Sequence, residues 1–472
     1  MLLSKQKVAL ESLVSRQFAG KLLLRNEIQL EDKQFEQFLA DGVLRPSPSI
    51  VKQLFSAICQ RCGNRKKYLF GRIPCKQCNQ NHLYCRKCIE MGRVMECEPL
   101  YYWNGKEVVW PIIDQPCTWE GELTALQQRA SDRIVSAITN KEKELLVWAV
   151  CGAGKTEMLF PGIAEALRSG MRVCLATPRA DVVQELLPRI RNAFKFVNIQ
   201  GLYGGSEEKT GNAQLIISTT HQLLRFKAAF HFLIIDEVDA FPFHNDPSLP
   251  YAAKRSLHST QSTTIYLTAT PRRNQQLRLW MKQLPHVFVP SRFHGHPLPV
   301  PILKTCTSLK KDIQNNRVPY SLLNWMRKRI SPHRQLLIFV PTIELVEQLY
   351  KNSLVQLPQQ KLLTSKNRIM CVHASDPERK EKVQLFRGKK IDILITTTIL
   401  ERGVTFPSVD VAIIDASHRV FDEAALVQIA GRAGRSPDDP KGEVVFFHNG
   451  KTNSMVHAID AIKSMNKRGG FI

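Results

Sequence analysis

Short apolar runs alternate with stretches of helical periodicity from about residue 140 onward. In the first half of this region the runs lie at residues 144–150, 171–176, 214–218, 232–236 and 264–268. Such runs are typical of strands that are buried on both faces, and helices between them connect strands that lie parallel. The pattern therefore predicts an α/β domain with a parallel sheet.

The same alternation resumes in the last third of the chain, at residues 335–340, 391–396, 409–415 and 443–448. A proline-rich stretch at residues 290–301 separates the two regions and is typical of a linker or a domain edge. We therefore expect two α/β domains in tandem, at residues 119–295 and 333–472, with a linker and domain edge at 296–332.

The chain before residue 119 shows neither the short apolar runs nor the helical periodicity of these two domains. Residues 1–58 are basic and rich in Leu, Gln and Glu, so we expect a helical or partly disordered leader. Residues 59–118 carry closely spaced cysteines and many aromatic side chains, which predicts a small separate module. No run of about 18 apolar residues is free of charge, which excludes an integral membrane protein, and the first residues do not resemble a secretory signal.

The overall charge narrows the choice of partner. Lys and Arg number 66 against 42 Asp and Glu, which gives a net charge of +24 and a pI of about 9.7. A chain this basic is expected to meet a polyanion, either a nucleic acid or an anionic membrane face. With 43% hydrophobic and 23% charged residues the composition is that of an ordinary globular protein, which excludes disorder and coiled coil as the main structure.

A glycine-rich segment joins the first predicted strand to a helix expected at 155–168. Residues 149–156 read Ala-Val-Cys-Gly-Ala-Gly-Lys-Thr, the pattern of a phosphate-binding loop. Glycine lets backbone N–H groups face a phosphate, and the following helix adds its positive end. Lys155 is expected to reach the β- and γ-phosphates, and the Thr156 hydroxyl to bind Mg²⁺. The predicted nucleotide-binding residues here are Gly152, Ala153, Gly154, Lys155 and Thr156.

A second motif carries three carboxylates. Residues 232–239 form an apolar strand that ends in Asp-Glu-Val-Asp. Ligands in such sheets bind at the carboxyl ends of the strands. We expect Asp236 to hold Mg²⁺ and Glu237 to orient or deprotonate the attacking water, while Asp239 is expected to pair with groups in the second α/β domain.

With these two motifs the chain resembles a superfamily-two helicase, because further segments follow in that order. They lie at residues 123–127, 177–179, 218–222, 268–270, 396–403 and 428–435. The resemblance implies two RecA-like domains that bind ATP in the cleft between them. It implies that Gln127 reads adenine, that Gly403 faces ATP, and that Gln428, Arg432 and Arg435 complete the catalytic site from the second domain.

The resemblance also implies a nucleic-acid interface. In this superfamily several strand-end segments hold the nucleic-acid backbone. The corresponding residues here are Thr177, Arg179, Thr219, Thr220 and Thr396. The segment Thr268-Ala-Thr270 matches the one that couples hydrolysis to domain movement.

Within this superfamily the chain most resembles the ComFA family of late-competence ATPases. The segments that carry this resemblance are residues 148–162, 219–225, 235–242 and 397–405. The resemblance implies a cytosolic protein, peripheral at the inner face of the cell membrane, which acts on incoming single-stranded DNA. It implies as partners the phosphoribosyltransferase-like ComFC, the recombination mediator DprA as a second candidate, and the DNA-import channel. The oligomeric state stays open.

Eight of the twelve cysteines lie between residues 59 and 117. Three Cys-x-x-Cys pairs offer six thiolates, which is too many for one zinc ion, and an iron–sulfur cluster also takes four cysteines. Spacing does not choose between the pairs. The ComFA resemblance implies Zn²⁺ on Cys59, Cys62, Cys85 and Cys88. It leaves Cys75 and Cys78 as an extra pair, with the weaker candidates His82, Cys97 and Cys117.

The sequence therefore predicts a zinc-containing, single-stranded-DNA-dependent ATPase or translocase that uses ATP and Mg²⁺ to drive uptake of transforming DNA. One alternative is a DNA-repair or replication-restart helicase. Another, of a different class, is a nucleotide-gated assembly factor for competence proteins.

Overall fold

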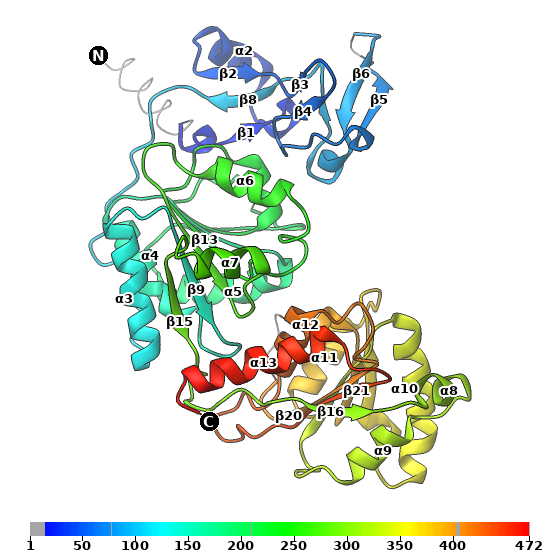
Figure 1. Cartoon of the computed structure of the whole chain (residues 1–472). Helices are drawn as coiled ribbons and strands as arrows, with labels where there is room; N and C mark the ends of the chain where they lie inside the picture. The colour runs from blue at the N-terminus through cyan, green and yellow to red at the C-terminus, as the bar shows by residue number, and fades with distance from the viewer. Residues whose placement is uncertain (1–14, 77, 209, 403–405, 472) are drawn as a thin grey trace.

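The computed structural model describes residues 15–76, 78–208, 210–402 and 406–471. It contains an N-terminal module followed by two parallel-sheet domains in tandem (Figure 1). The fold class predicted from the sequence is therefore confirmed.

The first domain is built on a sheet in the order β11-β12-β10-β13-β14-β9-β15, in which all neighbours are parallel. The predicted runs became β9, β10, β12, β13 and β14 because their side chains are almost all buried. The strands are β9 (Glu144–Ala149), β10 (Val173–Thr177), β11 (Ile199–Leu202), β12 (Leu215–Thr219), β13 (Phe232–Ile235), β14 (Thr263–Thr268) and β15 (His286–Val289). The helices are α3 (Ala125–Thr139), α4 (Phe160–Arg168), α5 (Ala180–Ala193), α6 (Ser248–Ser256) and α7 (Arg273–Trp280), with short 3₁₀ turns η4 (Glu157–Leu159) and η5 (Thr220–Arg225).

The second domain has a parallel sheet in the order β16-β21-β20-β17-β19-β18. Its strands are β16 (Ile302–Thr305), β17 (Gln335–Phe339), β18 (Ile369–Val372), β19 (Ile393–Thr396), β20 (Val409–Ile414) and β21 (Val444–His448). Its helices are α8 (Leu309–Gln314), α9 (Tyr320–Arg327), α10 (Ile343–Gln359), α11 (Arg379–Arg387), α12 (Glu423–Ala430) and α13 (Asn453–Arg468), with 3₁₀ turns η6 (Lys366–Arg368) and η7 (Thr398–Leu400). The segment 296–332, expected as a linker, thus supplies β16, α8 and α9 to this domain.

The N-terminal module consists of three small antiparallel sheets, β1-β8-β2, β3-β4 and β5-β6-β7. The elements are β1 (Leu22–Leu23), η1 (Arg25–Glu27), α2 (Asp32–Ala40), β2 (Leu44–Ser47), β3 (Ile50–Lys52), β4 (Ala57–Cys59), η2 (Lys67–Leu69), β5 (Phe70–Pro74), β6 (Asn81–Cys85), η3 (Arg86–Met91), β7 (Val94–Met95) and β8 (Leu100–Trp103). Strands β1 and β2 both pair with β8. The described part of the expected leader 1–58 is therefore folded together with the cysteine segment, and residues 1–14 lie outside the described residues.

Polar contacts and a shared apolar cluster join this module to the first domain. Arg61 donates to the carboxylate of Glu27 at 2.7 Å, and Arg225 of the first domain donates to the same carboxylate at 3.0 Å. Arg255 donates to the Gln60 carbonyl at 2.9 Å. The module therefore rests on the end of the first domain that carries α6 and η5 (Figure 1).

Helix α13 of the second domain reaches back to the first. The Arg468 guanidinium lies 4.3 Å from the ring centre of Phe288 in β15. The Asn466 side chain exchanges two hydrogen bonds of 2.9 Å with the backbone of Leu298. Within the described residues no helix is both long and apolar enough to cross a membrane.

Candidate functional site

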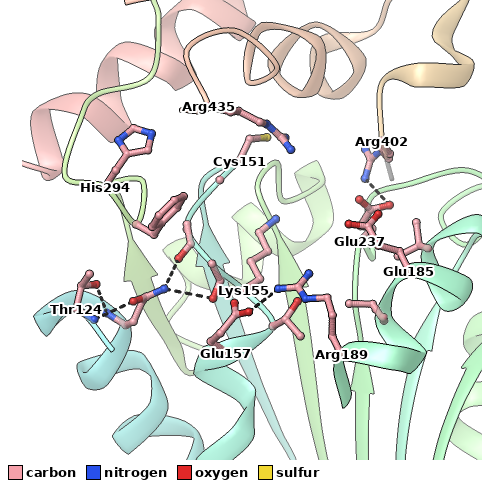
Figure 2. A pocket seen from close by; sticks show the side chains of 18 of the residues that line it. Thr124, Cys151, Lys155, Glu157, Glu185, Arg189, Glu237, His294, Arg402 and Arg435 are labelled. Carbon is pink, nitrogen blue, oxygen red and sulfur yellow. Dashed lines mark hydrogen bonds and ion pairs between the residues drawn. The ribbon is translucent and has the colours of Figure 1, made fainter. Parts of the chain in front are cut away.

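A cavity of about 480 Å³ lies where the two parallel-sheet domains meet, and side chains of both domains line it (Figure 2). The first domain contributes the predicted phosphate loop, with Gly152, Ala153, Gly154, Lys155 and Thr156, together with Gln127 and Glu237. The second domain contributes Arg402, Gln428, Arg432 and Arg435. The fold thus brings most of the predicted catalytic and nucleotide-binding residues to one cavity.

The phosphate loop curls because two of its residues occupy the left-handed region of backbone space. Gly152 has a φ of +80° and Gly154 a φ of +68°. A Cβ at Gly154 would lie 2.2 Å from Nε2 of Gln127, so any side chain here would displace the Gln127 carboxamide. Beyond the loop the chain first forms the 3₁₀ turn η4, and Lys155 points into the cavity (Figure 2). The loop is therefore shaped to turn its backbone donors toward an anion.

Gln127 holds the phosphate loop from the side of helix α3. Its Nε2 donates to the Ala153 carbonyl at 2.9 Å. Its Oε1 accepts the Thr124 backbone N–H at 2.8 Å, within a capping box that starts α3. Both ends of the carboxamide are therefore engaged with the protein, and adenine recognition by Gln127 stays a prediction.

The two carboxylates after β13 differ in their surroundings. Asp236 accepts the Glu237 backbone N–H at 2.8 Å, beside the cavity wall. Burial, and next the charge of Glu237, raise the pKa of Asp236 to about 6, although the Lys155 ammonium acts against them. Glu237 has a φ of +50° and lines the cavity itself. Asp236 thus lies behind Glu237, at the strand end where a divalent cation would be held.

Asp239 crosses to the second domain, as the sequence predicted. Its carboxylate accepts from Arg402 at 2.6 Å, and from the hydroxyls of Thr268 and Thr270 at 2.6 and 2.7 Å. Burial alone would raise the pKa of Asp239, but the charge and hydrogen bond of Arg402 and the two hydroxyls hold it well below its usual range. Arg402 also lies 3.6 Å from Glu237 (Figure 2). One arginine therefore connects both carboxylates across the domain boundary.

The arginine motif forms the opposite wall. Arg432 is buried and donates from Nε to the Glu401 carbonyl at 3.0 Å, and Arg435 donates from Nε to the Gly431 carbonyl at 2.8 Å. Burial and the proximity of Arg435 lower the pKa of Arg432 to about 9, so it is still cationic at neutral pH. The wall therefore has a strongly positive field, which favours a polyanionic ligand.

Gln428 lies beside this wall and contacts the phosphate loop. Its Oε1 accepts from the Cys151 thiol at 3.0 Å. Its Nε2 is buried without a hydrogen-bond partner within the described part of the chain. Buried donors of this kind are expected to serve a polar ligand, and the residues present therefore fit a nucleotide phosphate.

The residues predicted to hold DNA lie at strand ends of both domains. Thr177 ends β10, Thr219 ends β12, Thr220 follows it at the start of η5, and Thr396 ends β19; all four side chains are buried. Arg179 is half-buried and donates to the Ile399 carbonyl of the second domain at 2.9 Å. Their role in DNA binding stays a prediction. Gly403, predicted to face ATP, lies outside the described residues.

Sequence reasoning missed several residues of the cavity region, among them three with basic side chains. Arg402 lies within the segment 396–403 that the sequence did single out, so this segment was a usable signal. Arg292, which donates to the Gly434 carbonyl, and His294, which lines the cavity, lie in the proline-rich stretch. No local pattern marked these two. Phe293, which lies between them, donates its backbone N–H to the Gly152 carbonyl of the phosphate loop at 3.0 Å, and this contact follows from the pairing of β15 with β9.

The N-terminal module holds a second constellation. The thiols of Cys59, Cys62, Cys85 and Cys88 all lie within 4.8 Å of one another and are buried. The sulfur of Cys59 is 3.8 Å from that of Cys88, and Cys62 is 3.5 Å from Cys85. Tetrahedral zinc with Zn–S bonds of about 2.3 Å places its sulfurs roughly 3.8 Å apart, so this group could hold a zinc ion.

Comparison with known proteins places the chain among competence proteins. The family model "Competence protein ComFA N-terminal domain" matches residues 6–102, "Type III restriction enzyme, res subunit" matches 120–273, and "Helicase conserved C-terminal domain" matches 319–437. Competence protein ComFA of Bacillus subtilis is 44% identical over 450 residues, which cover 94% of this chain and 93% of the relative. The chain belongs to the ComFA family.

A second ComFA protein, from Streptococcus pneumoniae, is 38% identical over 97% of this chain and 99% of its own length. Among solved structures, Mycobacterium smegmatis helicase Lhr bound to ssDNA and AMP-PNP is similar with a TM-score of 0.52 and 19% identity. That match covers 74% of this chain and 50% of Lhr, and supports the fold alone. The chain is therefore a competence-related, helicase-like ATPase whose fold implies the use of a nucleotide and Mg²⁺.

Proposed function

We propose that this ComFA protein is a single-stranded-DNA-dependent ATPase and translocase that drives uptake of transforming DNA during natural competence. The observation that carries the proposal is the shared cavity, in which the phosphate loop and Glu237 of one domain face Arg402, Arg432 and Arg435 of the other. A ligand that needs both walls favours the closed arrangement of the domains, and its hydrolysis removes that preference.

The residues of the cavity support hydrolysis of ATP in particular. The loop amides and Lys155 would hold the β- and γ-phosphates, and Thr156 and Asp236 would hold Mg²⁺, which neutralises charge on the phosphate oxygens. Glu237 is placed to orient the attacking water. Arg432 and Arg435 would stabilise the charge that builds on the transferred phosphoryl group.

The net charge of the chain and the positions of the predicted DNA contacts support DNA as the polymer along which the protein moves. The net charge of +24 favours a polyanion. The predicted DNA contacts lie at strand ends of both domains, and Arg179 already touches the second domain. If the two domains hold the strand in turn, a cycle of closure and opening moves it past the protein.

We infer that Zn²⁺ is held by Cys59, Cys62, Cys85 and Cys88. Their thiols belong to the apolar cluster that joins the module to the first domain. Zinc there would fix the end of β4 to the end of β6. It would thereby stabilise the part of the module that packs against the first domain. Its role would be structural.

Membership of the ComFA family supports the proposed location and protein partners. We propose that the protein works in the cytoplasm, peripheral at the inner face of the membrane, next to the DNA-import channel. ComFC and DprA are the proposed protein partners.

The test is the steady-state ATPase rate of the full chain with no nucleic acid, single-stranded DNA, duplex DNA or RNA, with Lys155→Ala as the inactive control. Stimulation by single-stranded DNA above all others is expected. No stimulation by any nucleic acid would overturn the proposal and favour a nucleotide-gated assembly factor. Strand separation in a displacement assay would favour a repair or restart helicase instead.

A further inference from the structure

The N-terminal module contains a second cluster of metal-binding side chains, apart from the buried four-cysteine group. We propose that Cys75, Cys78, Cys97 and His82 form a second zinc site. The three thiols lie within 4.8 Å of one another, and Nε2 of His82 lies 3.0 Å from the sulfur of Cys78. Three thiolates and one imidazole are a common donor set for tetrahedral Zn²⁺.

The backbone around Cys75 repeats that of the buried site. In the first Cys-x-x-Cys turn, the Gly63 N–H donates to the Cys59 carbonyl at 2.8 Å, and the Cys59 N–H donates to the Asn64 carbonyl at 3.0 Å. In the second turn, the Asn79 N–H donates to the Cys75 carbonyl at 2.9 Å, and the Cys75 N–H to the Gln80 carbonyl at 2.9 Å.

Gly63 and Asn79, each just after the second cysteine, both have a positive φ, of 70° and 52°. The two turns thus have the same hydrogen-bond pattern and the same left-handed backbone conformation after the second cysteine. Such a turn directs both thiols of the pair to one side, where a metal ion holds them. A chain that only happens to contain two nearby cysteines has no reason to repeat this geometry.

A carboxylate stands behind His82. Its Nδ1 lies 3.9 Å from Glu96, next in sequence to Cys97. Glu96 also accepts the Leu83 backbone N–H at 3.2 Å and pairs with Lys52. Histidine ligands of zinc usually present their second nitrogen to a carboxylate, which fixes the ring and leaves Nε2 free for the metal.

The second site differs from the first in exposure. Cys78 and Cys97 are exposed, whereas the four cysteines of the first site are fully buried. The ligands come from the turn between β5 and β6, from β6 itself and from the segment after β7. Zinc there would tie the tip of the β5-β6 hairpin to the end of β7.

The test is the zinc content of the purified full chain by elemental analysis, for the native protein and for Cys78→Ser, Cys97→Ser and the control Cys117→Ser. We expect about two zinc ions per chain in the native protein and the control, and about one in each of the two cluster variants. Far-ultraviolet circular dichroism of the variants should match the native spectrum, because the site is exposed, so loss of zinc will not reflect unfolding.

Cobalt substitution adds an independent readout. A Co²⁺-loaded protein should lose part of its thiolate-to-metal absorption in Cys78→Ser, and His82→Ala should shift the remaining bands. One zinc ion in the native protein, unchanged in Cys78→Ser, would overturn the proposal. So would a disulfide among these thiols, seen as an intact mass about two daltons low and restored by reductant.

Discussion

The buried pair of Asp239 and Arg402 is expected to couple the two domains during catalysis. Nη2 of Arg402 lies 2.6 Å from Oδ2 of Asp239, and the side chains of Asp239 and Arg402 are 0% and 2% exposed. Breaking a buried ion pair from one side costs about 3–5 kcal/mol when the other charge is left without a partner. Arg402 keeps longer ion pairs with Glu237 and Glu401, at 3.6 and 3.4 Å, so this range is an upper bound for Asp239. If the closed arrangement is needed for hydrolysis, Asp239→Asn should lower kcat/KM for ATP by more than about tenfold and at most about 5,000-fold, at about 1.4 kcal/mol per factor of ten.

A matched control is present at the same domain boundary. Arg272 and Asp422 also form an Arg–Asp pair between the domains, at 3.0 Å, but their side chains are 33% and 45% exposed. Exposed pairs contribute about 0–1 kcal/mol. Asp422→Asn should therefore lower kcat/KM by no more than about fivefold, which separates the effect of burial from the mere loss of an interdomain contact.

A double-mutant cycle shows whether Asp239 acts through Arg402. Arg402 lines the cavity, so Arg402→Gln is expected to be costly by itself. In that background Asp239→Asn should cost little more, because no buried cation is left unpaired. An equal cost in both backgrounds, or a loss no greater than that of Asp422→Asn, would refute the reasoning.

Three further predictions use other parts of the chain. Glu237→Gln should keep ATP binding while turnover falls at least about 100-fold, as measured by filter binding and single-turnover hydrolysis; near-native turnover would assign the water-orienting role elsewhere. Because the pKa of Asp236 is raised to about 6, its carboxyl is protonated below that pH, so the apparent Mg²⁺ affinity of the ATPase should fall about tenfold per pH unit there; a flat profile between pH 5 and 7 would contradict this. Cys59→Ala should lose one zinc ion and lower the yield of folded protein, whereas Cys117→Ala should do neither, and full zinc in the Cys59 variant would point to other ligands.

Local sequence patterns were enough to predict the part of the cavity that the first domain supplies. The phosphate loop and the acidic motif are each contiguous and follow a strand of buried residues, so sequence order fixes their place at the edge of the sheet. The same reasoning predicted that Asp239 turns to the second domain. It did not identify Arg402 as the partner, because that contact depends on how two domains dock across more than 160 residues of chain.

Other features could not be predicted because their signals are weak or distant. Strand β1 has only two residues, so no alternation of apolar and polar positions marks it, and it forms by pairing with β8 far along the chain. The threonines chosen as DNA contacts were placed correctly at strand ends. Sequence gives no side-chain direction, however, and in the structure these threonines are buried.

The contacts of Asp239 connect the cavity with a strand end at which a DNA contact is predicted. The same carboxylate binds Thr268 and Thr270 at the end of β14 and Arg402 in the second domain. Arg402 lies on the segment that follows β19, whose last residue, Thr396, is a predicted DNA contact. A change at Glu237 when phosphate is released would alter its 3.6 Å contact with Arg402. Because packed ion pairs switch between discrete arrangements, that change would be passed to the end of β19 without a separate relay.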